Sequence, residues 1–427
     1  MAKAKSKKIT LEEVLVPVEE QPYDVPENWC WVKLEAIASV VTGKKDANYG
    51  SEDGEYTFFT CAGKPIRCEG FSFEGESLIL PGNGANVGQV FYYNGKFEAY
   101  QRTYVLQAKA GNIDLKYLYY QMLFAWNDAN KDKQFGSATN YIKMGNFTNY
   151  DVPLPPLSEQ QRIVKQIESL FSKLDEAKEK VQEVIDGYEA RNAAVYNAAF
   201  SGRLTAQWRK DNYKENKWET KRFDEVASIR GNLVDPSDYL EYPHIAPDNI
   251  EKRTGILLDY HTIAEDGVKS GKHRFYAGQI LYSKIRPYLS KVVMVDFDGL
   301  CSADMYPIEA KENTKYLLYY MLSDMFLEQA SSAGSRSVLP KINQKELSAI
   351  KVRITSDEEQ KEVVRILDYL LPMMQQVRDK AVQVVDNIDT IKKSILAKAF
   401  RGKLGTNIPE DEFAMELLKI ILNKGEC

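Results

Sequence analysis

The chain has 427 residues, of which 44% are apolar, 11% aromatic and 27% charged. This composition is typical of a folded globular protein with two or three domains and excludes a disordered or collagen-like chain. The sequence has no apolar run of about 18 residues, and the lysines at its start are not followed by the apolar segment of a signal peptide. We therefore expect a cytoplasmic protein without a membrane segment.

The net charge is −5, whereas a protein that coats nucleic acid without regard to sequence is normally basic overall. Any binding of nucleic acid must therefore come from local patches. The five cysteines are scattered, and Cys61 and Cys68 do not have the spacing of a zinc motif. Only three histidines occur. We expect reduced thiols and no metal site.

An internal repeat organises the sequence. Residues 152–204 align without a gap on residues 352–404 at a constant offset of 200, and weaker matches continue upstream. The chain is therefore two copies of one plan, a mixed α and β domain followed by a long helix. In chain order we predict an N-terminal extension (1–27), a mixed domain (28–157), a long helix (158–204), a second mixed domain (212–355), a second long helix (356–404) and an amphipathic tail (405–427).

The first mixed domain is predicted to have strands at 31–34, 77–80 and 89–93 and a helix at 115–127. A glycine-rich loop, 81–88, joins two of these strands. The stretch from residue 77 to 113 has few acidic residues and contains amide side chains of the type that reads adenine, together with an arginine. We predict that these residues bind DNA: Asn83, Asn86, Gln89, Gln101 and Arg102. For Asn83 and Asn86, plain turn formation beside glycine is an equally good interpretation.

A polar loop follows the helix of each mixed domain, at 135–140 and 333–337. Small hydroxyl and amide residues beside glycine can approach a phosphate closely, so we include Ser137, Thr139, Asn140, Ser335 and Arg336 among the DNA-binding candidates. Ordinary turns would have the same composition.

The first long helix has apolar residues at alternating spacings of four and three, as a coiled-coil seam requires. They are Ile163, Ile167, Leu170, Leu174, Ala177, Val181, Val184 and Tyr188. Ser158 and Gln161 have the spacing of a capping box at its start, and Gly202 marks its end.

The second mixed domain is predicted to have strands at 279–282 and 292–295 and a helix at 315–329. Between residues 267 and 295 all charged residues are basic, and aromatic residues lie among them. Such a stretch suits phosphates and guanine edges, although most charged runs are merely solvated surfaces. The candidates are Lys269, Lys272, Arg274, Lys284, Arg286, Tyr288 and Lys291.

The second long helix repeats the seam at Val363, Leu367, Leu370, Met374, Val377, Ala381, Val384, Ile388, Ile391 and Ile395. Ser356 and Glu359 form a second candidate capping box, and Pro372 should kink or break the helix. Two matching helices in one chain can pair antiparallel as a rod of roughly 60 Å that acts as a spacer. We therefore predict an α+β fold with pseudo-twofold symmetry, in which an antiparallel coiled coil joins two similar domains. A bundle core or a dimerisation coil would give the same periodicity.

The sequence offers little catalytic chemistry. The loop 81–88 is neither a dinucleotide fingerprint nor a P-loop, and no methyltransferase motif appears. The best candidate for a nuclease site is Asp298 with Glu309 and Lys311, but the first copy lacks the carboxylate at the equivalent position. We predict no catalytic residue in this chain. Whether the amphipathic tail docks on this chain or on a partner is open.

Three segments resemble the specificity (S) subunits of type I restriction-modification systems. They are Pro26–Trp29 (PENW), Val152–Val164 (VPLPPLSEQQRIV) and Phe200–Leu204 (FSGRL), and the resemblance extends over about residues 26 to 405. The second copy departs from this pattern, because residues 351–356 lack the prolines.

The resemblance implies that each mixed domain is a target-recognition domain for one half of a split, asymmetric sequence in double-stranded DNA, and that the helices set the unread spacer. It implies two methyltransferase (M) subunits that use S-adenosylmethionine and restriction (R) subunits that use ATP and magnesium, with no cofactor in this chain. Two alternatives remain open, a metal-dependent nuclease and a coiled-coil adaptor that reads no DNA. Replacing Arg286 by alanine should relax recognition of one half-site if the chain is a specificity subunit, but not under either alternative.

Overall fold

The computed structural model describes residues 10–109, 113–135, 140–333 and 340–424. The chain forms two compact units. Unit 1 contains Met1–Lys180 and Val384–Cys427, and unit 2 contains Val181–Gln383. The units are larger than the mixed domains predicted from the sequence because each includes part of both long helices, α5 (Leu157–Asp186) and α13 (Asp357–Ala399).

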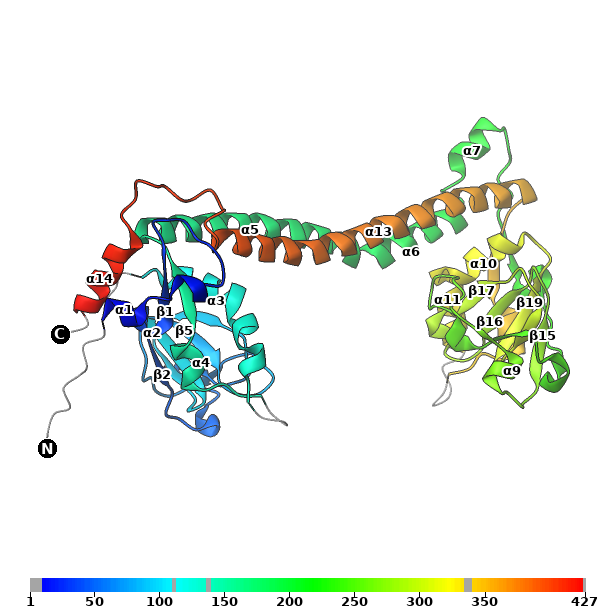
Figure 1. Ribbon diagram of the computed structural model, residues 1–427. Helices are drawn as coiled ribbons and strands as arrows, with labels where there is room; N and C mark the ends of the chain where they lie inside the picture. The colour runs from blue at the N-terminus through cyan, green and yellow to red at the C-terminus, as the bar shows by residue number, and fades with distance from the viewer. Residues whose placement is uncertain (1–9, 110–112, 136–139, 334–339, 425–427) are drawn as a thin grey trace. The chain divides into compact units, whose positions relative to one another are not determined.

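The described strands of unit 1 form a pair and two larger sheets, and several of these strands are labelled in Figure 1. Its first and last strands, β1 (Cys30–Lys33) and β9 (Asp151–Leu154), pair with each other. A four-stranded sheet has the order β2 (Ala38–Thr42), β8 (Thr103–Ala108), β5 (Glu76–Pro81) and β6 (Phe91–Asn94). A smaller sheet contains β4 (Ile66–Cys68), β3 (Tyr56–Phe59) and β7 (Phe97–Ala99), and the pairing of β3 with β7 is parallel.

The core of unit 1 lies where the four-stranded sheet packs against helices. These helices are α1 (Leu11–Val14), α2 (Leu34–Ile37), α3 (Leu115–Asn130), α4 (Met144–Thr148) and α14 (Ala414–Lys424). Ala414, Leu418 and Ile421 of α14 are almost completely buried in this core. The amphipathic tail therefore docks on this chain.

Unit 2 repeats the frame of unit 1. Its outer strands β10 (Glu219–Arg222) and β20 (Lys351–Ile354) pair, and its four-stranded sheet has the equivalent order β11 (Ala227–Ile229), β19 (Met305–Ala310), β16 (Ile280–Ser283) and β17 (Val292–Met294). The second sheet differs, because it has five strands in the described residues: β12 (Leu233–Val234), β15 (Lys272–Phe275), β18 (Gly299–Cys301), β13 (Pro243–Ile245) and β14 (His261–Thr262).

The helices of unit 2 are α6 (Tyr188–Phe200), α7 (Ala206–Asp211), α8 (Phe223–Val226), α9 (Ile263–Asp266), α10 (Thr314–Leu322), α11 (Asp324–Ala333) and α12 (Gln344–Ala349). The helix predicted at 315–329 is interrupted at Ser323, whose hydroxyl donates to the carbonyl oxygen of Tyr320 at 2.6 Å. Short 3₁₀ turns include η6 (Pro287–Leu289). None of the helices that the structure describes is both long and apolar enough to cross a membrane.

The long helices pair antiparallel within each unit. In unit 1, Asp175 of α5 contacts Lys392 of α13 and Lys178 contacts Asp389, so residue numbers rise along one helix as they fall along the other. In unit 2, the Tyr188 hydroxyl donates to Gln375 at 2.5 Å. The predicted α+β fold with paired long helices is thus confirmed.

Several local predictions for the helices were wrong. The helix predicted at 158–204 is interrupted at Gly187, the residue type with the weakest helix propensity after proline, although the helical hydrogen bonds Gly187 N to Glu183 O and Arg191 N to Gly187 O continue across it. Conversely, α13 continues through Pro372, so the predicted break does not occur there. Ser158 is not an N-cap, because the carbonyl of Pro156 already accepts the amides at 159 and 160 and α5 begins at Leu157.

The predicted seam of the second helix is also partly wrong. Val377, Val384 and Ile391 are 51%, 43% and 44% exposed. After Val377, the side chain of Arg378 lies over the ring of Tyr188. After Ile391, the side chain of Lys392 lies over the ring of Phe171. At these two positions the following basic residue therefore packs on the partner helix. Long basic side chains can cover apolar surface with their stems while the charge stays in water.

Candidate nucleic-acid interface

In unit 1, backbone hydrogen bonds connect three loops at the ends of the central strands β5 and β8. We call this set of hydrogen bonds the backbone frame. The amide of Gly82, just after β5, donates to the carbonyl of Arg102 at 2.9 Å, and the amide of Ile142 donates to the carbonyl of Gly82 at 3.0 Å. Asn83 and Tyr141 form an isolated β-bridge. Three loops that are distant in sequence are thereby fixed beside one another.

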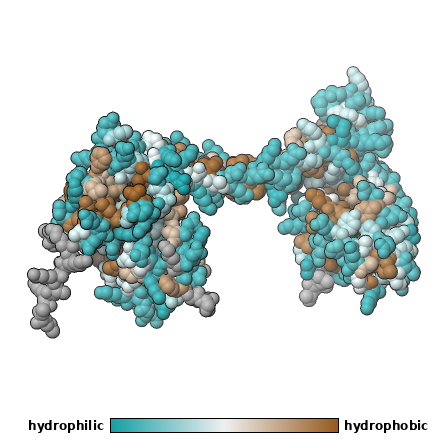
Figure 2. Space-filling view, viewed as in Figure 1, coloured by the Kyte–Doolittle hydropathy of each residue, from teal (hydrophilic) through white to brown (hydrophobic). Residues whose placement is uncertain are grey.

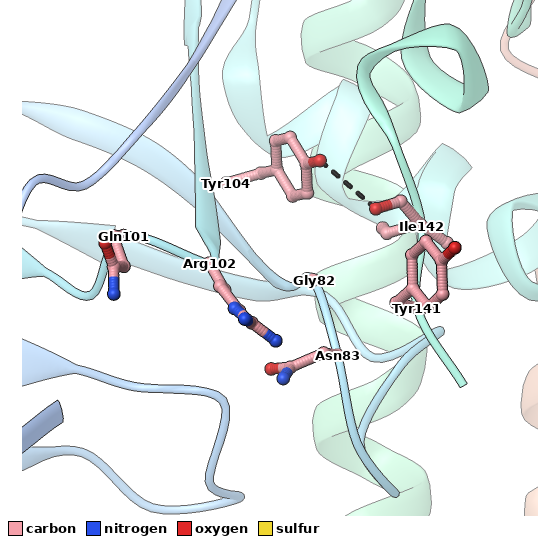
Figure 3. Close-up of a pocket in the computed structure, with 7 residues that line it drawn as sticks. All are labelled: Gly82, Asn83, Gln101, Arg102, Tyr104, Tyr141 and Ile142. Atoms are coloured by element: carbon pink, nitrogen blue, oxygen red, sulfur yellow. Dashed lines mark hydrogen bonds between the residues drawn. The ribbon is translucent and has the colours of Figure 1, made fainter. Parts of the chain in front are cut away.

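These loops surround a pocket of about 350 Å³ (Figure 3). Its lining consists of Gly82, Asn83, Gln101, Arg102, Tyr104, Tyr141 and Ile142. The Tyr104 hydroxyl donates to the Ile142 carbonyl at 3.2 Å and fixes the floor. Figure 3 shows the side chains of Arg102 and Asn83 extending to the same part of the pocket. Arg102 is exposed, and its guanidinium has no hydrogen bond or ion pair with the residues that the structure describes.

The other amides predicted to bind DNA in unit 1 have partners within the protein. Asn86 donates to the Cys61 carbonyl at 2.9 Å and accepts from Gln89 at 3.1 Å, while Gln101 donates to Asp46 at 2.9 Å. Asn86 therefore has the turn-building role considered as the alternative. These bonds fix the shape of the loop and leave Asn83 and Arg102 as the better candidates for contact with a ligand.

Of the candidates in the polar loops, only Asn140 lies within the described residues. Its side chain is exposed. Its backbone carbonyl accepts a hydrogen bond from the backbone amide of Gly84 at 2.9 Å, which connects this loop to the glycine-rich loop. The remaining candidates lie outside the described residues: Ser137, Thr139, Ser335 and Arg336.

The same backbone frame occurs in unit 2. The amide of Lys284 donates to the carbonyl of Asp304 at 2.9 Å, the amide of Ile342 donates to the carbonyl of Lys284 at 2.9 Å, and Ile285 forms a bridge with Lys341. Lys284 therefore corresponds to Gly82, Asp304 to Arg102, and Lys341 to Tyr141. The frame is shared while the side chains on it differ in charge and size.

Two of the predicted basic contacts in unit 2 face the protein. Lys272 is only 5% exposed, and its ammonium donates to the carbonyl and hydroxyl oxygens of Ser270. Burial lowers the pKa of Lys272 from its ordinary value. Lys291 donates to the carbonyl of Pro247 at 2.7 Å and pairs with Asp248 at 3.3 Å. These amines support loops of the protein, so Lys272 and Lys291 are weaker candidates for contact with a ligand than the displayed residues.

Other members of the basic stretch are displayed. Lys269, Arg286 and Tyr288 are exposed, and Arg286 has a left-handed backbone with φ of 47° at the start of η6. Ser290 at the end of this turn has φ of 46°. Left-handed conformations are uncommon for residues other than glycine, and such strain concentrates at functional loops.

Two further basic residues are held by their neighbours. Arg274 lies over the rings of Tyr239, Tyr242 and Tyr276, at 5.4, 5.9 and 4.9 Å from their centroids. The Lys284 ammonium donates to the carbonyl of Ala303 at 2.6 Å. Both side chains are half-buried, so their charge reaches the surface in a fixed position.

The nuclease alternative gains no support from the geometry. Glu309 pairs with Arg230 at 2.7 Å, Asp298 accepts the amide of Ala277 at 3.0 Å, and Lys311 donates to the carbonyl of Asp224 at 2.7 Å. Each of the three groups is thus engaged separately. Within the described part of the chain, no three acidic, histidine or cysteine side chains gather in a way that could hold a metal ion.

Four residues at the pocket and the two backbone frames were not predicted from the sequence: Tyr104, Tyr141, Asp304 and Lys341. The repeat contained a signal for two of them, because Tyr141 and Lys341 are related by the same offset of 200 that aligns the long helices. Asp304 lies outside the basic stretch, so the charge pattern gives no signal for it.

Comparisons with known proteins agree with this architecture. A family model described as "Type I restriction modification DNA specificity domain" matches residues 26–186 and again residues 215–380. The specificity subunit of the type I restriction enzyme EcoDI from Escherichia coli is 39% identical over 402 residues, which cover 89% of each chain. The specificity subunit of MjaVIII from Methanocaldococcus jannaschii is 24% identical, over 89% of this chain and 94% of the relative.

Solved structures show the same fold. The crystal structure of the HsdS subunit from Thermoanaerobacter tengcongensis matches 91% of this chain and all of that chain, with a TM-score of 0.59 and 17% identity. A chain from a study of complex assembly and conformational transition in a type I restriction-modification system matches 90% of this chain and all of its own length, with a TM-score of 0.64 and 18% identity. The fold and the family matches thus define a protein that has two DNA specificity domains, each joined to a long helix. The chain belongs to the family of type I restriction-modification specificity subunits.

Proposed function

We propose that each unit of this specificity subunit reads one half of a bipartite, asymmetric site in double-stranded DNA. The observation that carries the proposal is the repeated backbone frame at 82, 102 and 142 and at 284, 304 and 342, which holds different side chains in the two units. A common scaffold with unequal side chains favours two half-sites of unequal sequence.

The long helices set the unread separation between the half-sites and bind partner proteins. The exposed apolar residues of α13 support a docking role. Tyr369, Met373 and Val377 are 66%, 39% and 51% exposed in unit 2, and Val384 and Ile391 are exposed in unit 1. Figure 2 shows hydrophobic residues at the surface of the long helices among hydrophilic ones. Exposed apolar side chains grouped along a helix favour a protein contact.

The partners are two methyltransferase (M) subunits, which bind S-adenosylmethionine and methylate adenine, and restriction (R) subunits, which use ATP and magnesium. The support comes from relatives named as specificity subunits of type I restriction enzymes and from the structural neighbour that was solved in a study of how such a system assembles. This chain supplies recognition and no catalysis, and the complex acts in the cytoplasm.

The test is a genome-wide map of methylated adenine in cells that express this chain with its methyltransferase subunit. We expect a motif of two short specified parts separated by a fixed number of unspecified bases. A methylated motif consisting of one unbroken sequence would overturn the proposal. The methyltransferase expressed alone is the control and should give no motif.

A further inference from the structure

Strand register identifies one pair of equivalent positions on the two frames. In unit 1, Thr103 of β8 pairs with Pro81 of β5, and Arg102 directly precedes it. In unit 2, Met305 of β19 pairs with Ser283 of β16, and Asp304 directly precedes it. The carbonyls of both preceding residues accept the same backbone hydrogen bond, at 2.9 Å in each unit. Arg102 and Asp304 therefore occupy equivalent positions on the two frames, and their side chains carry opposite charges.

The two side chains offer opposite hydrogen-bonding chemistry. The guanidinium of Arg102 only donates, is exposed and lines the pocket beside Asn83. The carboxylate of Asp304 only accepts. Its side chain is 42% exposed, so a ligand can reach it.

Two lysines make Asp304 compatible with a polyanion. Lys341 lies 3.1 Å and Lys284 4.0 Å from its Oδ1 atom. The three side chains carry one net positive charge, as Arg102 does alone, so a phosphate backbone is attracted to both frames. Both lysine contacts fall on Oδ1, and Oδ2 can therefore accept a hydrogen bond from a ligand.

We propose that positions 102 and 304 are equivalent base-reading positions, at which Arg102 contacts a guanine of one half-site and Asp304 contacts the amino group of a cytosine of the other. In the major groove, arginine donates to O6 and N7 of guanine, whereas aspartate accepts from N4 of cytosine. The assignment rests on the proposed function and deepens it, because it names a residue and a base for each half.

The experiment maps methylated adenine for the complex that contains Arg102→Ala or Asp304→Asn. Each variant should relax one base of one half-site, with a loss of discrimination on the order of tenfold, and leave the other half and the spacing unchanged. The relaxed base should be a guanine for Arg102→Ala and a cytosine for Asp304→Asn. Asp304→Glu keeps the carboxylate and should keep the cytosine.

The matched controls are Lys131→Ala in unit 1, on the 3₁₀ turn after α3, and Glu241→Gln in unit 2, on a surface turn. Both residues are exposed, and both changes should leave the motif intact. A bipartite motif that is the same for wild type, Arg102→Ala and Asp304→Asn would overturn the assignment of these residues while the proposed function stands. Relaxation at bases other than guanine and cytosine would also overturn it. Absence of a bipartite motif for the wild type would instead overturn the proposed function.

Discussion

A buried carboxylate in unit 2 allows a quantitative test of the structure. Glu359, in the first turn of α13, is 1% exposed and accepts hydrogen bonds from four groups. Thr205, Thr355 and Trp218 donate at 2.5, 2.7 and 2.9 Å, and Arg209 forms a hydrogen-bonded ion pair with it. Glu359 thereby joins the segment after α6, the opening of the second mixed domain and the start of α13.

The pKa of Glu359 is consistent with this role. Burial by itself would raise this pKa, but the hydrogen bonds from Thr205, Thr355, Trp218 and Arg209 together outweigh burial and lower the pKa below its ordinary value of 4.5. Because the folded-state pKa is lower than the unfolded-state pKa, ionised Glu359 stabilises the fold above the unfolded value. This contribution is lost as the pH falls through the folded value.

We predict that Glu359→Gln destabilises unit 2. Arg209 is only 14% exposed at its side chain and would lose its charged partner. Breaking a buried pair costs about 3 to 5 kcal/mol, and we take about 3 kcal/mol because glutamine keeps one acceptor oxygen. For a unit of this size, that loss lowers the melting temperature by about 6 to 12 °C. The difference from wild type should start to shrink as the pH falls below about 4.5, where the carboxyl group becomes protonated in the unfolded chain, and should be lost once the pH passes below the lower folded-state pKa.

The assay is calorimetry of the full chain, combined with amide hydrogen exchange at residues 205–218 and 355–359. Glu358→Gln is the matched control, because Glu358 is 62% exposed and lies 3.9 Å from Lys214. Its loss should change stability by less than about 0.5 kcal/mol. Equal melting temperatures for Glu359→Gln and Glu358→Gln would refute the reasoning.

Three further predictions concern the other unit and the long helices. Phe400→Ala should cost about 3 to 5 kcal/mol, because the ring is fully buried against Tyr117, and thermal unfolding would measure it. Leu418→Ala should cost about 2 to 5 kcal/mol and increase hydrogen exchange in α1 and α14; an unchanged exchange rate would show that the tail is not docked in solution. Val377→Asp should change stability by less than about 0.5 kcal/mol but weaken binding of the methyltransferase subunit, as measured by calorimetric titration, and unaltered affinity would count against the docking role of α13.

Much of the fold could be predicted from the sequence because the repeat and the helical periodicity are local patterns. The offset of 200 located both long helices, and the strands β5, β16 and β17 lie within a residue or two of their predicted positions. The smaller sheets could not be predicted in this way. They depend on parallel pairings such as Thr57 with Phe97 and His244 with Leu300, which join strands far apart in the chain.

The sequence could not show which basic residues of the candidate site are displayed at the surface. A count of basic residues treats every lysine as displayed, whereas strand register decides which face a side chain takes. Lys272 lies in β15 opposite Val234 and is buried, while Lys284 and Arg286 of the same stretch reach the surface. In the same way, Val377 was placed in the helical seam because it is apolar, although the stem of Arg378 packs there.

The central claim is that each unit reads its own half-site. The most direct measurement compares the methylated motifs of two complexes, one with Asn83→Ala in unit 1 and one with Arg286→Ala in unit 2. The account predicts that each change relaxes bases in a different half, at a cost of about 1 to 3 kcal/mol for Arg286→Ala, with the spacing preserved. If both substitutions alter the same half, or if neither alters the motif, the account is contradicted.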